Sequence, residues 1–300
     1  MSRENCRYPS LFRTASGGLI QGELVVRKDA AYQQIQSGQS ELKHHYGERV
    51  HIAADAFLWS QLARLCETET IQPEVNHLVR SLYTALIQRV VAAHFPTIER
   101  SITTRMAQFD SQPERASWTG ALLNRTQKVV TVDVARAGML PSQICFDVLN
   151  TVLQPEGIRQ DHVIMARTTD ENERVTGAHF GESKIGGDID NAIVLFPDPM
   201  GATGSSLSKA IAHYKSDVEG TPARIVAMNL IVTPEYLNRL TQDHPDVDIH
   251  VLRVDRGASS PEILSSELGE HWDQESGLND KQYILPGGGG FGEIINNAYC

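Results

Sequence analysis

Residues 192–206 read Ala-Ile-Val-Leu-Phe-Pro-Asp-Pro-Met-Gly-Ala-Thr-Gly-Ser-Ser. The apolar run Ile193 to Phe196 has the β-branched content of a buried strand. Pro197 and Pro199 end that strand, because neither residue can donate to a ladder. Residues 207–212 then show helical spacing. A strand, a turn of small residues and a helix N-terminus together predict an anion site, where free N–H groups point outward and the helix dipole adds positive charge.

The turn in this stretch carries small side chains and hydroxyl groups. Its glycines let a phosphate approach the backbone closely, and Thr203, Ser205 and Ser206 add hydroxyl donors. Asp198 cannot hold the phosphate itself, so its carboxylate is suited to sugar hydroxyls or to a hydrated magnesium ion. The structural alternative is an ordinary strand-to-helix turn with Ser or Thr as N-cap. A Walker loop is excluded, since no Gly-Lys-Ser/Thr closes the turn.

The motif Asp-Pro-Met-x-Ala-Thr-Gly-x-Ser resembles the phosphoribosyl-diphosphate (PRPP) loop of uracil phosphoribosyltransferases, which usually reads DPMLATGGS. Gly201 replaces the usual Leu, and Ser205 replaces a Gly. The resemblance implies the type I phosphoribosyltransferase fold, an α/β fold with a mostly parallel sheet flanked by helices. It also implies that the loop binds PRPP through Asp198, Pro199, Met200, Gly201, Ala202, Thr203, Gly204, Ser205 and Ser206.

The bulk composition limits the class of protein. The 300 residues are 41% hydrophobic and 21% charged, as in a globular protein. A net charge of −10 argues against a general nucleic-acid or membrane-surface binder. The four cysteines form no CxxC pair, which favours reduced thiols in a cytosol. The start shows no signal-peptide core and no apolar run could span a bilayer, so we expect a cytoplasmic protein.

Strand and helix patterns alternate along the chain and predict a mostly parallel sheet with right-handed crossovers. We expect an N-terminal extension over residues 1–54, with a possible strand at Leu24-Val25-Val26, and a phosphoribosyltransferase-like domain over residues 55–300. Residues 171–190 fit a flexible β-arm over the site, or an exposed hairpin without a role. The expected segments are two helices within 55–94, a polar loop at 95–126, a strand at 128–134, a helix at 141–153, strands at 162–170, 224–232 and 245–254, a helix from Pro234, and an insertion at 256–275.

Two arginines follow predicted strands. Arg136 lies at a strand's C-terminal edge beside Gly138, where ligands bind in open α/β sheets. The family has Leu-Arg-Ala-Gly at this point, which implies that Arg136 contacts the diphosphate, with Ala135 in place of the Leu. Arg167, at the end of the next strand, is a second diphosphate candidate by the same resemblance. For each, a surface arginine without a ligand is the alternative.

The C-terminal segment from Leu278 to Glu293 carries a second resemblance. The family ends in a similar Leu-Asn, then Tyr-Ile-x-Pro-Gly-x-Gly-Asp-Ala-Gly-Asp-Arg, which closes over the base and reads it largely through backbone groups. Here Gly290 replaces the first acid, Phe291 a small Ala, and Ile294 the arginine, which makes uracil a doubtful substrate. The implied base-site residues are Tyr283, Ile284, Leu285, Gly287, Gly288, Gly289, Gly292 and Glu293.

The histidines near the start suggest a metal site only weakly. His44, His45 and His51 have no cysteine or acid at ligand spacing, so solvated histidines are the preferred interpretation. We therefore expect no protein-held metal, and Mg²⁺ only as a companion of PRPP.

The resemblance implies an enzyme that transfers the phosphoribosyl group of PRPP to uracil or a related base, with Asp198 and Arg136 as catalytic residues. It also implies a homo-oligomer, a dimer or tetramer, and leaves GTP as a possible regulator. The main alternative is a non-catalytic relative that binds PRPP or a nucleotide, and another is a catalyst for a different base or aglycone. A serine hydrolase is weaker still, since no Gly-x-Ser-x-Gly elbow is present.

Overall fold

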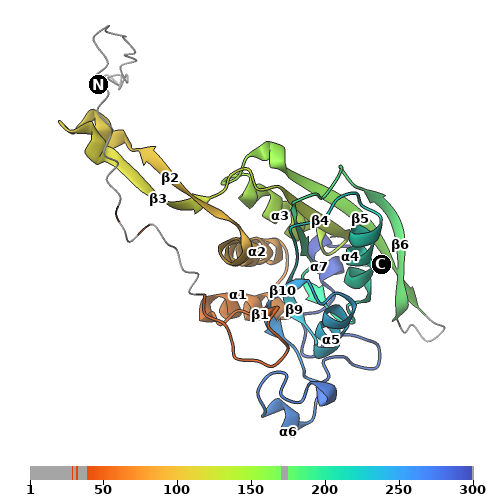
Figure 1. Cartoon of the computed structure of the whole chain (residues 1–300). Helices are drawn as coiled ribbons and strands as arrows, with labels where there is room; N and C mark the ends of the chain where they lie inside the picture. The colour runs from red at the N-terminus through yellow and green to blue at the C-terminus, as the bar shows by residue number, and fades with distance from the viewer. Residues whose placement is uncertain (1–28, 30–31, 33–38, 170–174, 299–300) are drawn as a thin grey trace, which may run out of the picture. The chain divides into compact units, whose positions relative to one another are not determined.

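The computed structural model describes residues 29, 32, 39–169 and 175–298, with the side chains of 166–180 left out (Figure 1). The chain divides into two compact units: residues 1–34 with 99–121, and residues 35–98 with 122–300. The expected strand at residues 24–26 lies outside the described residues.

The second unit is built on one sheet in the order β1-β10-β9-β7-β4-β5-β6, with β8 paired to β9. Every neighbouring pair is parallel except β5 and β6, so the predicted mostly parallel sheet is confirmed. The strands are β1 (Val50–Ile52), β4 (Val129–Ala135), β5 (Ile158–Thr169), β6 (Val175–Lys184), β7 (Ile193–Pro197), β8 (Met200–Gly201), β9 (Arg224–Val232) and β10 (Asp248–Val254).

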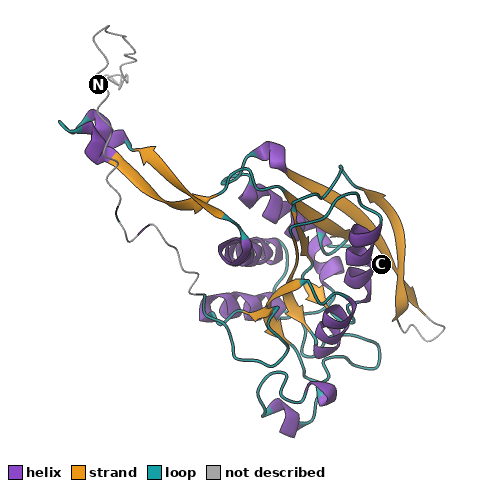
Figure 2. Cartoon of the chain, viewed as in Figure 1, coloured by secondary structure: helices purple, strands orange, loops and turns teal. Residues whose placement is uncertain are grey.

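Helices lie on both faces of this sheet (Figure 2). Alternate residues of a strand face opposite sides. Ile193 and Leu195 pack with α1, α2, α3 and α7, whereas Val194 and Phe196 pack with α4 and α5. Both faces of β7 are therefore covered, which explains its uninterrupted apolar sequence. The helices are α1 (Ala56–Cys66), α2 (Glu74–His94), α3 (Met139–Leu149), α4 (Ser205–Ser216), α5 (Pro234–Asp243), α6 (Pro261–Leu264) and α7 (Phe291–Asn296).

The first unit corrects one expectation. Residues 95–126 form not a loop but a hairpin of β2 (Thr97–Thr103) and β3 (Ser117–Leu123), with short 3₁₀ turns between them. Nearly every residue of β2 is exposed, so the strand lacks the apolar alternation that reveals a half-buried strand. Its sequence therefore looks like a polar loop.

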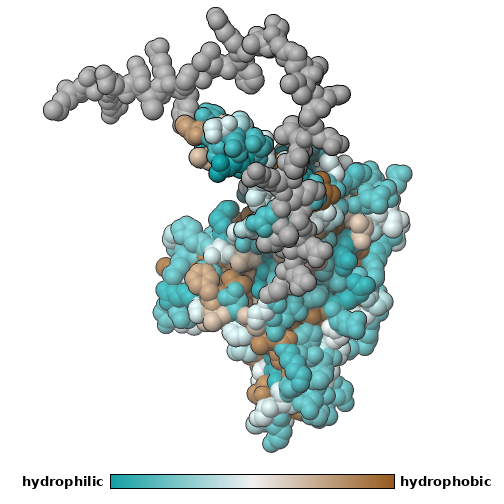
Figure 3. Space-filling model, turned by 60° about the vertical axis from the view of Figure 1, so that its left-hand side comes forward, coloured by the Kyte–Doolittle hydropathy of each residue, from teal (hydrophilic) through white to brown (hydrophobic). Residues whose placement is uncertain are grey.

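Two other segments refine the expected organisation. Residues 50–52, inside the expected extension, form β1 and pair with β10 in the central sheet. Within the expected arm at 171–190, the structure shows β6, which pairs antiparallel with β5, and residues 170–174 lie outside the described part. Where residues are described, no helix combines the length and apolar character needed to cross a bilayer. On the face drawn in Figure 3, hydrophilic side chains cover most of the described surface.

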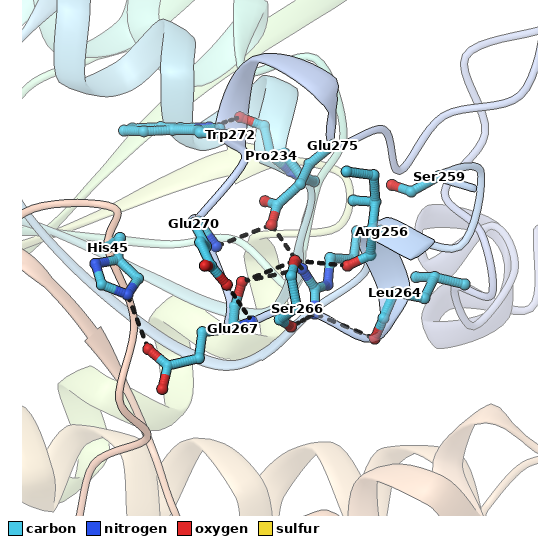
Figure 4. A network of polar contacts seen from close by, with 12 residues as sticks. His45, Pro234, Arg256, Ser259, Leu264, Ser266, Glu267, Glu270, Trp272 and Glu275 are labelled. Carbon is cyan, nitrogen blue, oxygen red and sulfur yellow. Dashed lines mark hydrogen bonds and ion pairs between the residues drawn. The ribbon is translucent and has the colours of Figure 1, made fainter. Parts of the chain in front are cut away.

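The insertion at 256–275 folds around a buried ion pair (Figure 4). Arg256 Nη1 donates to Glu275 Oε1 at 2.6 Å, and the exposed fractions of these side chains are 10% and 0%. Glu275 also accepts from the Tyr46 hydroxyl at 2.5 Å and from the Gly269 amide at 2.9 Å. Burial, and then the bond to Glu275, raise the pKa of Tyr46. The insertion is thus fastened to residues upstream of β1 through one carboxylate.

We predict that Arg256→Met lowers the free energy of unfolding by about 3 kcal/mol, because Glu275 then becomes a buried charge without a cationic partner. Urea denaturation followed by circular dichroism measures the change. Lys43→Met removes the exposed Lys43–Glu267 pair and should leave the midpoint unchanged. Equal midpoints for all three proteins would show that the buried pair does not hold the insertion.

Candidate functional site

A cavity of about 920 Å³ opens at the carboxyl ends of the central strands. Its walls come from the ends of β4 and β5, from the loop after β7, and from the C-terminal segment that carries α7. This is the edge at which ligands bind in open parallel sheets. The lining residues are Val134, Ala135, Arg136, Ala137, Ile164, Met165, Asp198, Met200, Ala202, Ser206, Gln282, Tyr283, Ile284 and 288–294.

A smaller cavity of about 60 Å³ adjoins the first and lies over residues 200–207. The two share Asp198, Met200, Ala202, Ser206 and Gln282 in their walls. A ligand in the larger cavity can thus place one end over the start of α4.

Three consecutive carbonyl groups of this loop, those of residues 201–203, bond to protein. The Gly201 carbonyl accepts from the Thr233 amide at 3.1 Å, and the Ala202 carbonyl accepts from the Thr233 hydroxyl at 2.6 Å. The Thr203 carbonyl accepts from Arg239 Nε at 3.0 Å. In a planar trans peptide the C=O and the next N–H point in opposite directions. Because the carbonyls of residues 201–203 point toward α5 and its N-cap, the amides of residues 202–204 point away from α5.

These amides, with that of Ser206, form what we call the amide cluster. In the part of the chain that the structure describes, no acceptor in the protein is paired with them. The helix ladder of α4 begins only with the bond from the Ser208 amide to the Gly204 carbonyl. The Ser205 amide makes a long contact of 3.4 Å with Thr203 Oγ1. The amide cluster therefore offers several donors and the positive end of a helix to one anion.

Two glycines make this loop shape possible. Gly204 has φ of 74°, in the left-handed region that glycine tolerates best. A Cβ on Gly201 would lie 2.6 Å from the ring of Tyr236. The buried tyrosine thus occupies the space that a side chain at 201 would need, which explains why the family's usual Leu is absent here.

Asp198 is held through its backbone. Asn229 donates its Nδ2 to the Asp198 carbonyl at 2.6 Å, and its Oδ1 accepts from the Tyr236 hydroxyl at 2.8 Å. Burial and the nearby Asp198 charge raise the pKa of Tyr236, so its hydroxyl stays protonated and donating. Asn229 and Tyr236 therefore position the Asp198 residue, whose carboxylate lines both cavities.

Arg136 lines the large cavity, as do Ala202 and Ser206 of the amide cluster. Its guanidinium donates to Glu293 Oε1 at 3.2 Å and to the Ala298 carbonyl at 3.2 Å. Gly138 lets the Arg136 loop pack tightly, because a Cβ there would lie 2.9 Å from the backbone of Val134. The cation is thus fixed at the site by α7 and remains partly exposed, with 39% of its side chain accessible.

The C-terminal departures from the family pattern have structural explanations. A Cβ on Gly290 would lie 2.3 Å from Glu293 Oε2, so the Glu293 carboxylate occupies the space of an acid at 290. Phe291 is 2% exposed, and its ring packs in the core beneath Gly288. The site therefore keeps a carboxylate, and the added phenyl bulk is largely withdrawn from the cavity.

The sequence interpretation missed a pair of charges under the C-terminal segment. Arg253 Nη2 donates to the Gly287 carbonyl at 3.0 Å, and Asp255 Oδ2 accepts from the Gly287 amide at 2.8 Å. Arg253 also bonds Asp255 directly, at 2.5 and 2.8 Å. Burial lowers the pKa of Arg253, but the hydrogen bond and charge of Asp255 outweigh it and raise that pKa overall. Both backbone groups of Gly287 are therefore used to anchor the segment.

Gln282 was also missed. It lies in the walls of both cavities and has φ of 66°, an unusual value for a residue other than glycine. Such backbone outliers concentrate at functional sites. The left-handed backbone at Gln282 is visible only in the structure, so the sequence carried no signal for this residue.

The structure brings most of the predicted residues together. Those at the large cavity are Arg136, Asp198, Met200, Ala202, Ser206, Tyr283, Ile284, Gly288, Gly289, Gly292 and Glu293. Gly201, Thr203, Gly204 and Ser205 line the small one. Pro199, Leu285 and Gly287 line neither, and their carbonyls accept bonds from Ile231, Gly257 and Arg253. Arg167 lies on β5, and its side chain is outside the described part.

Comparison with known proteins agrees with this geometry. A family profile described as uracil phosphoribosyltransferase matches residues 53–274. The chain belongs to the uracil phosphoribosyltransferase family. The uracil phosphoribosyltransferase of Roseiflexus sp. is 26% identical over 248 residues, which are 82% of this chain and 97% of that protein.

Two other members of the family match more closely over shorter stretches. The uracil phosphoribosyltransferase of Thermococcus sibiricus is 34% identical over 93 residues, 31% of this chain and 39% of that protein. That of Mycoplasmoides gallisepticum is 36% identical over 113 residues, 38% of this chain and 44% of that protein. These two matches thus span less than half of each relative.

A solved structure shares the fold. The AQ2163 protein from Aquifex aeolicus superposes with a TM-score of 0.61 at 20% identity, covering 82% of this chain and 97% of that one. The expected mostly parallel sheet with flanking helices is confirmed (Figure 2), and membership of the uracil phosphoribosyltransferase family agrees with the expected type I phosphoribosyltransferase-like fold.

We predict that Asp255→Ala loosens the C-terminal segment without unfolding the protein. The Gly287 amide loses its acceptor, and its hydrogen exchange should accelerate by about tenfold or more. Mass spectrometry of peptides covering residues 283–290 measures the rate. Asp217→Ala removes an exposed aspartate paired with His213 and should leave this rate unchanged. An unchanged rate in Asp255→Ala would contradict the anchoring role.

Proposed function

We propose that this protein transfers the 5-phosphoribosyl group of PRPP to a nucleobase, uracil or a related base, with release of diphosphate. The observation that carries the proposal is the amide cluster, which follows Asp198 in the chain and shares the wall of the large cavity with Asp198 and Arg136 through Ala202 and Ser206. Family membership supports the same substrates.

In this proposal the 5-phosphate of PRPP binds the amide cluster and the hydroxyls of Thr203, Ser205 and Ser206. The 60 Å³ cavity over this loop is of a size for one such group. Glycines at 201 and 204 let the loop backbone pack closely against β9 and α5.

Asp198 then faces the ribose. Its carboxylate binds sugar hydroxyls and stabilises the positive charge that develops on the ring as the diphosphate leaves. Arg136 neutralises the departing diphosphate, and Glu293, now its partner at 3.2 Å, gives way to that group. Magnesium, carried with PRPP, supplies further charge neutralisation there. A base nitrogen attacks the anomeric carbon, the glycosidic bond forms as the bond to diphosphate breaks, and the proton of that nitrogen is released together with the diphosphate.

The base belongs at the C-terminal wall of the same cavity. Tyr283, Ile284 and the glycines at 288 and 289 present side chains and main chain to it. A planar imide has donors and acceptors along one edge, which backbone groups can match. Phe291 lines this wall but is 2% exposed and packs in the core, so we expect its ring to take little of the space that a pyrimidine needs.

A second candidate function is that of a relative that binds PRPP without turnover. The Arg136–Glu293 pair favours it, because a carboxylate already holds the cation.

We predict that an assay of diphosphate release, with PRPP, magnesium and a panel of pyrimidines and purines, distinguishes the two functions. Turnover with uracil supports transfer, and PRPP binding without release for any base supports the regulatory role.

We predict that Asp198→Asn and Arg136→Ala each lower kcat/KM for PRPP by about 100-fold or more, since each removes charge stabilisation at the reacting centre. Arg80→Ala, an exposed arginine on α2, is the matched control and should keep full activity. Titration calorimetry with PRPP and magnesium measures binding in parallel. Wild-type affinity in the Asp198 plus Arg136 double variant would contradict the assignment.

A further inference from the structure

Three histidines from three elements meet away from the large cavity. His51 lies on β1 and His250 on β10, where the two are direct neighbours in the parallel ladder. His94 is the last residue of α2. One ring nitrogen of each lies within 4.8 Å of those of the others. None of the three lines either of the cavities described above.

The rings are close packed. His94 Nε2 and His250 Nε2 are 2.7 Å apart, with the rings at 88° to each other. The His51 ring stacks on that of His250, with centroids 4.4 Å apart. His250 is 2% exposed, whereas His51 keeps access to solvent with 21% of its side chain exposed. The cluster thus has a buried base and an open side through which an ion can enter.

We propose that His51, His94 and His250 bind one divalent transition-metal ion of the zinc class. Two imidazole nitrogens on a tetrahedral zinc ion lie about 3.3 Å apart, with Zn–N of about 2.0–2.1 Å. The separations here, from 2.7 Å to at most 4.8 Å, bracket that value, so ring rotations bring all three nitrogens to one ion. Imidazole suits zinc, copper and nickel, and it is a poor ligand for magnesium.

The surroundings fit a metal site in a second way. Glu41 Oε1 lies 3.2 Å from His51 Nδ1, which leaves Nε2 of that ring for the metal. A carboxylate on the far nitrogen of a ligating histidine fixes its tautomer and orientation. Neutral imidazole is the form of histidine that ligates a metal, so we expect Zn²⁺ binding to weaken when the rings are protonated at low pH.

Such an ion joins an edge strand, its neighbour and the C-terminus of α2. β1 is only three residues long and, among the described strands, pairs with β10 alone. Residues 39–54, which precede α1, are thereby fixed to the core by the metal as well as by the ladder. The assigned role is to stabilise this edge of the sheet, with the fourth ligand supplied by water.

The test is titration of the full chain, stripped with EDTA, with Zn²⁺ by calorimetry and with Co²⁺ by visible absorption. We expect one ion per chain, tetrahedral Co²⁺ bands and a rise in Tm with Zn²⁺. His51→Gln and His94→Gln should each weaken Zn²⁺ binding by about 100-fold, and Glu41→Gln by about tenfold. His45→Gln, an exposed histidine paired with Glu267, is the control and should bind as wild type does.

Because His250 is buried and its replacement threatens folding, the partly exposed His51 carries the decisive comparison. Circular dichroism of the metal-free proteins checks that each variant is folded. Absence of Zn²⁺ binding in the wild type overturns the proposal. Equal Zn²⁺ affinity and stoichiometry in wild type, His51→Gln and His94→Gln would also overturn the proposal, because the ion would then bind elsewhere.

Discussion

The site depends on the direction in which three peptide groups point. Thr233 and Arg239 bind the carbonyls of residues 201–203, and planarity then directs the following amides toward the cavity. Thr233 is fully buried and also caps α5 by accepting from the Tyr236 amide at 3.0 Å. One threonine therefore couples the start of α5 to the anion site at the start of α4. The loop has no lysine or arginine of its own, so the attraction of this site for an anion comes from the backbone amides that this coupling orients.

Some departures from the family motif are compensated locally. Gly201 is matched by the Tyr236 ring, which occupies the space that a side chain at 201 would need. Phe291 replaces a small residue, yet it packs into the core that α7 shares with α1 and α2. Glu293 keeps the second acid of the C-terminal motif, whereas the first acid and the arginine are absent at Gly290 and Ile294. The PRPP loop thus keeps its shape, and the C-terminal segment keeps one carboxylate of two.

The sequence predicted the elements that are buried on both faces. The strands at residues 193–197 and 224–232, and the loop between Asp198 and Ser206, follow from apolar runs and turn chemistry that local physics determines. It did not predict the β2–β3 hairpin, whose exposed residues carry no apolar alternation. Nor could it reveal the Arg253–Asp255 pair at Gly287 or the cluster of His51, His94 and His250. Those contacts join residues 32 to 199 positions apart, and only the tertiary fold creates them.

The most direct test of the central claim is an NMR titration of the ¹⁵N-labelled protein with ribose 5-phosphate. The amide cluster predicts that the signals of Ala202, Thr203, Gly204 and Ser206 shift downfield and saturate together, as expected for new hydrogen bonds to one anion. Thr233→Val removes the hydroxyl that orients the Ala202 peptide and should weaken this binding by about tenfold. Thr241→Val, which removes a hydroxyl bonded within α5, should not. Saturating ribose 5-phosphate that leaves these four amides unmoved would contradict the account.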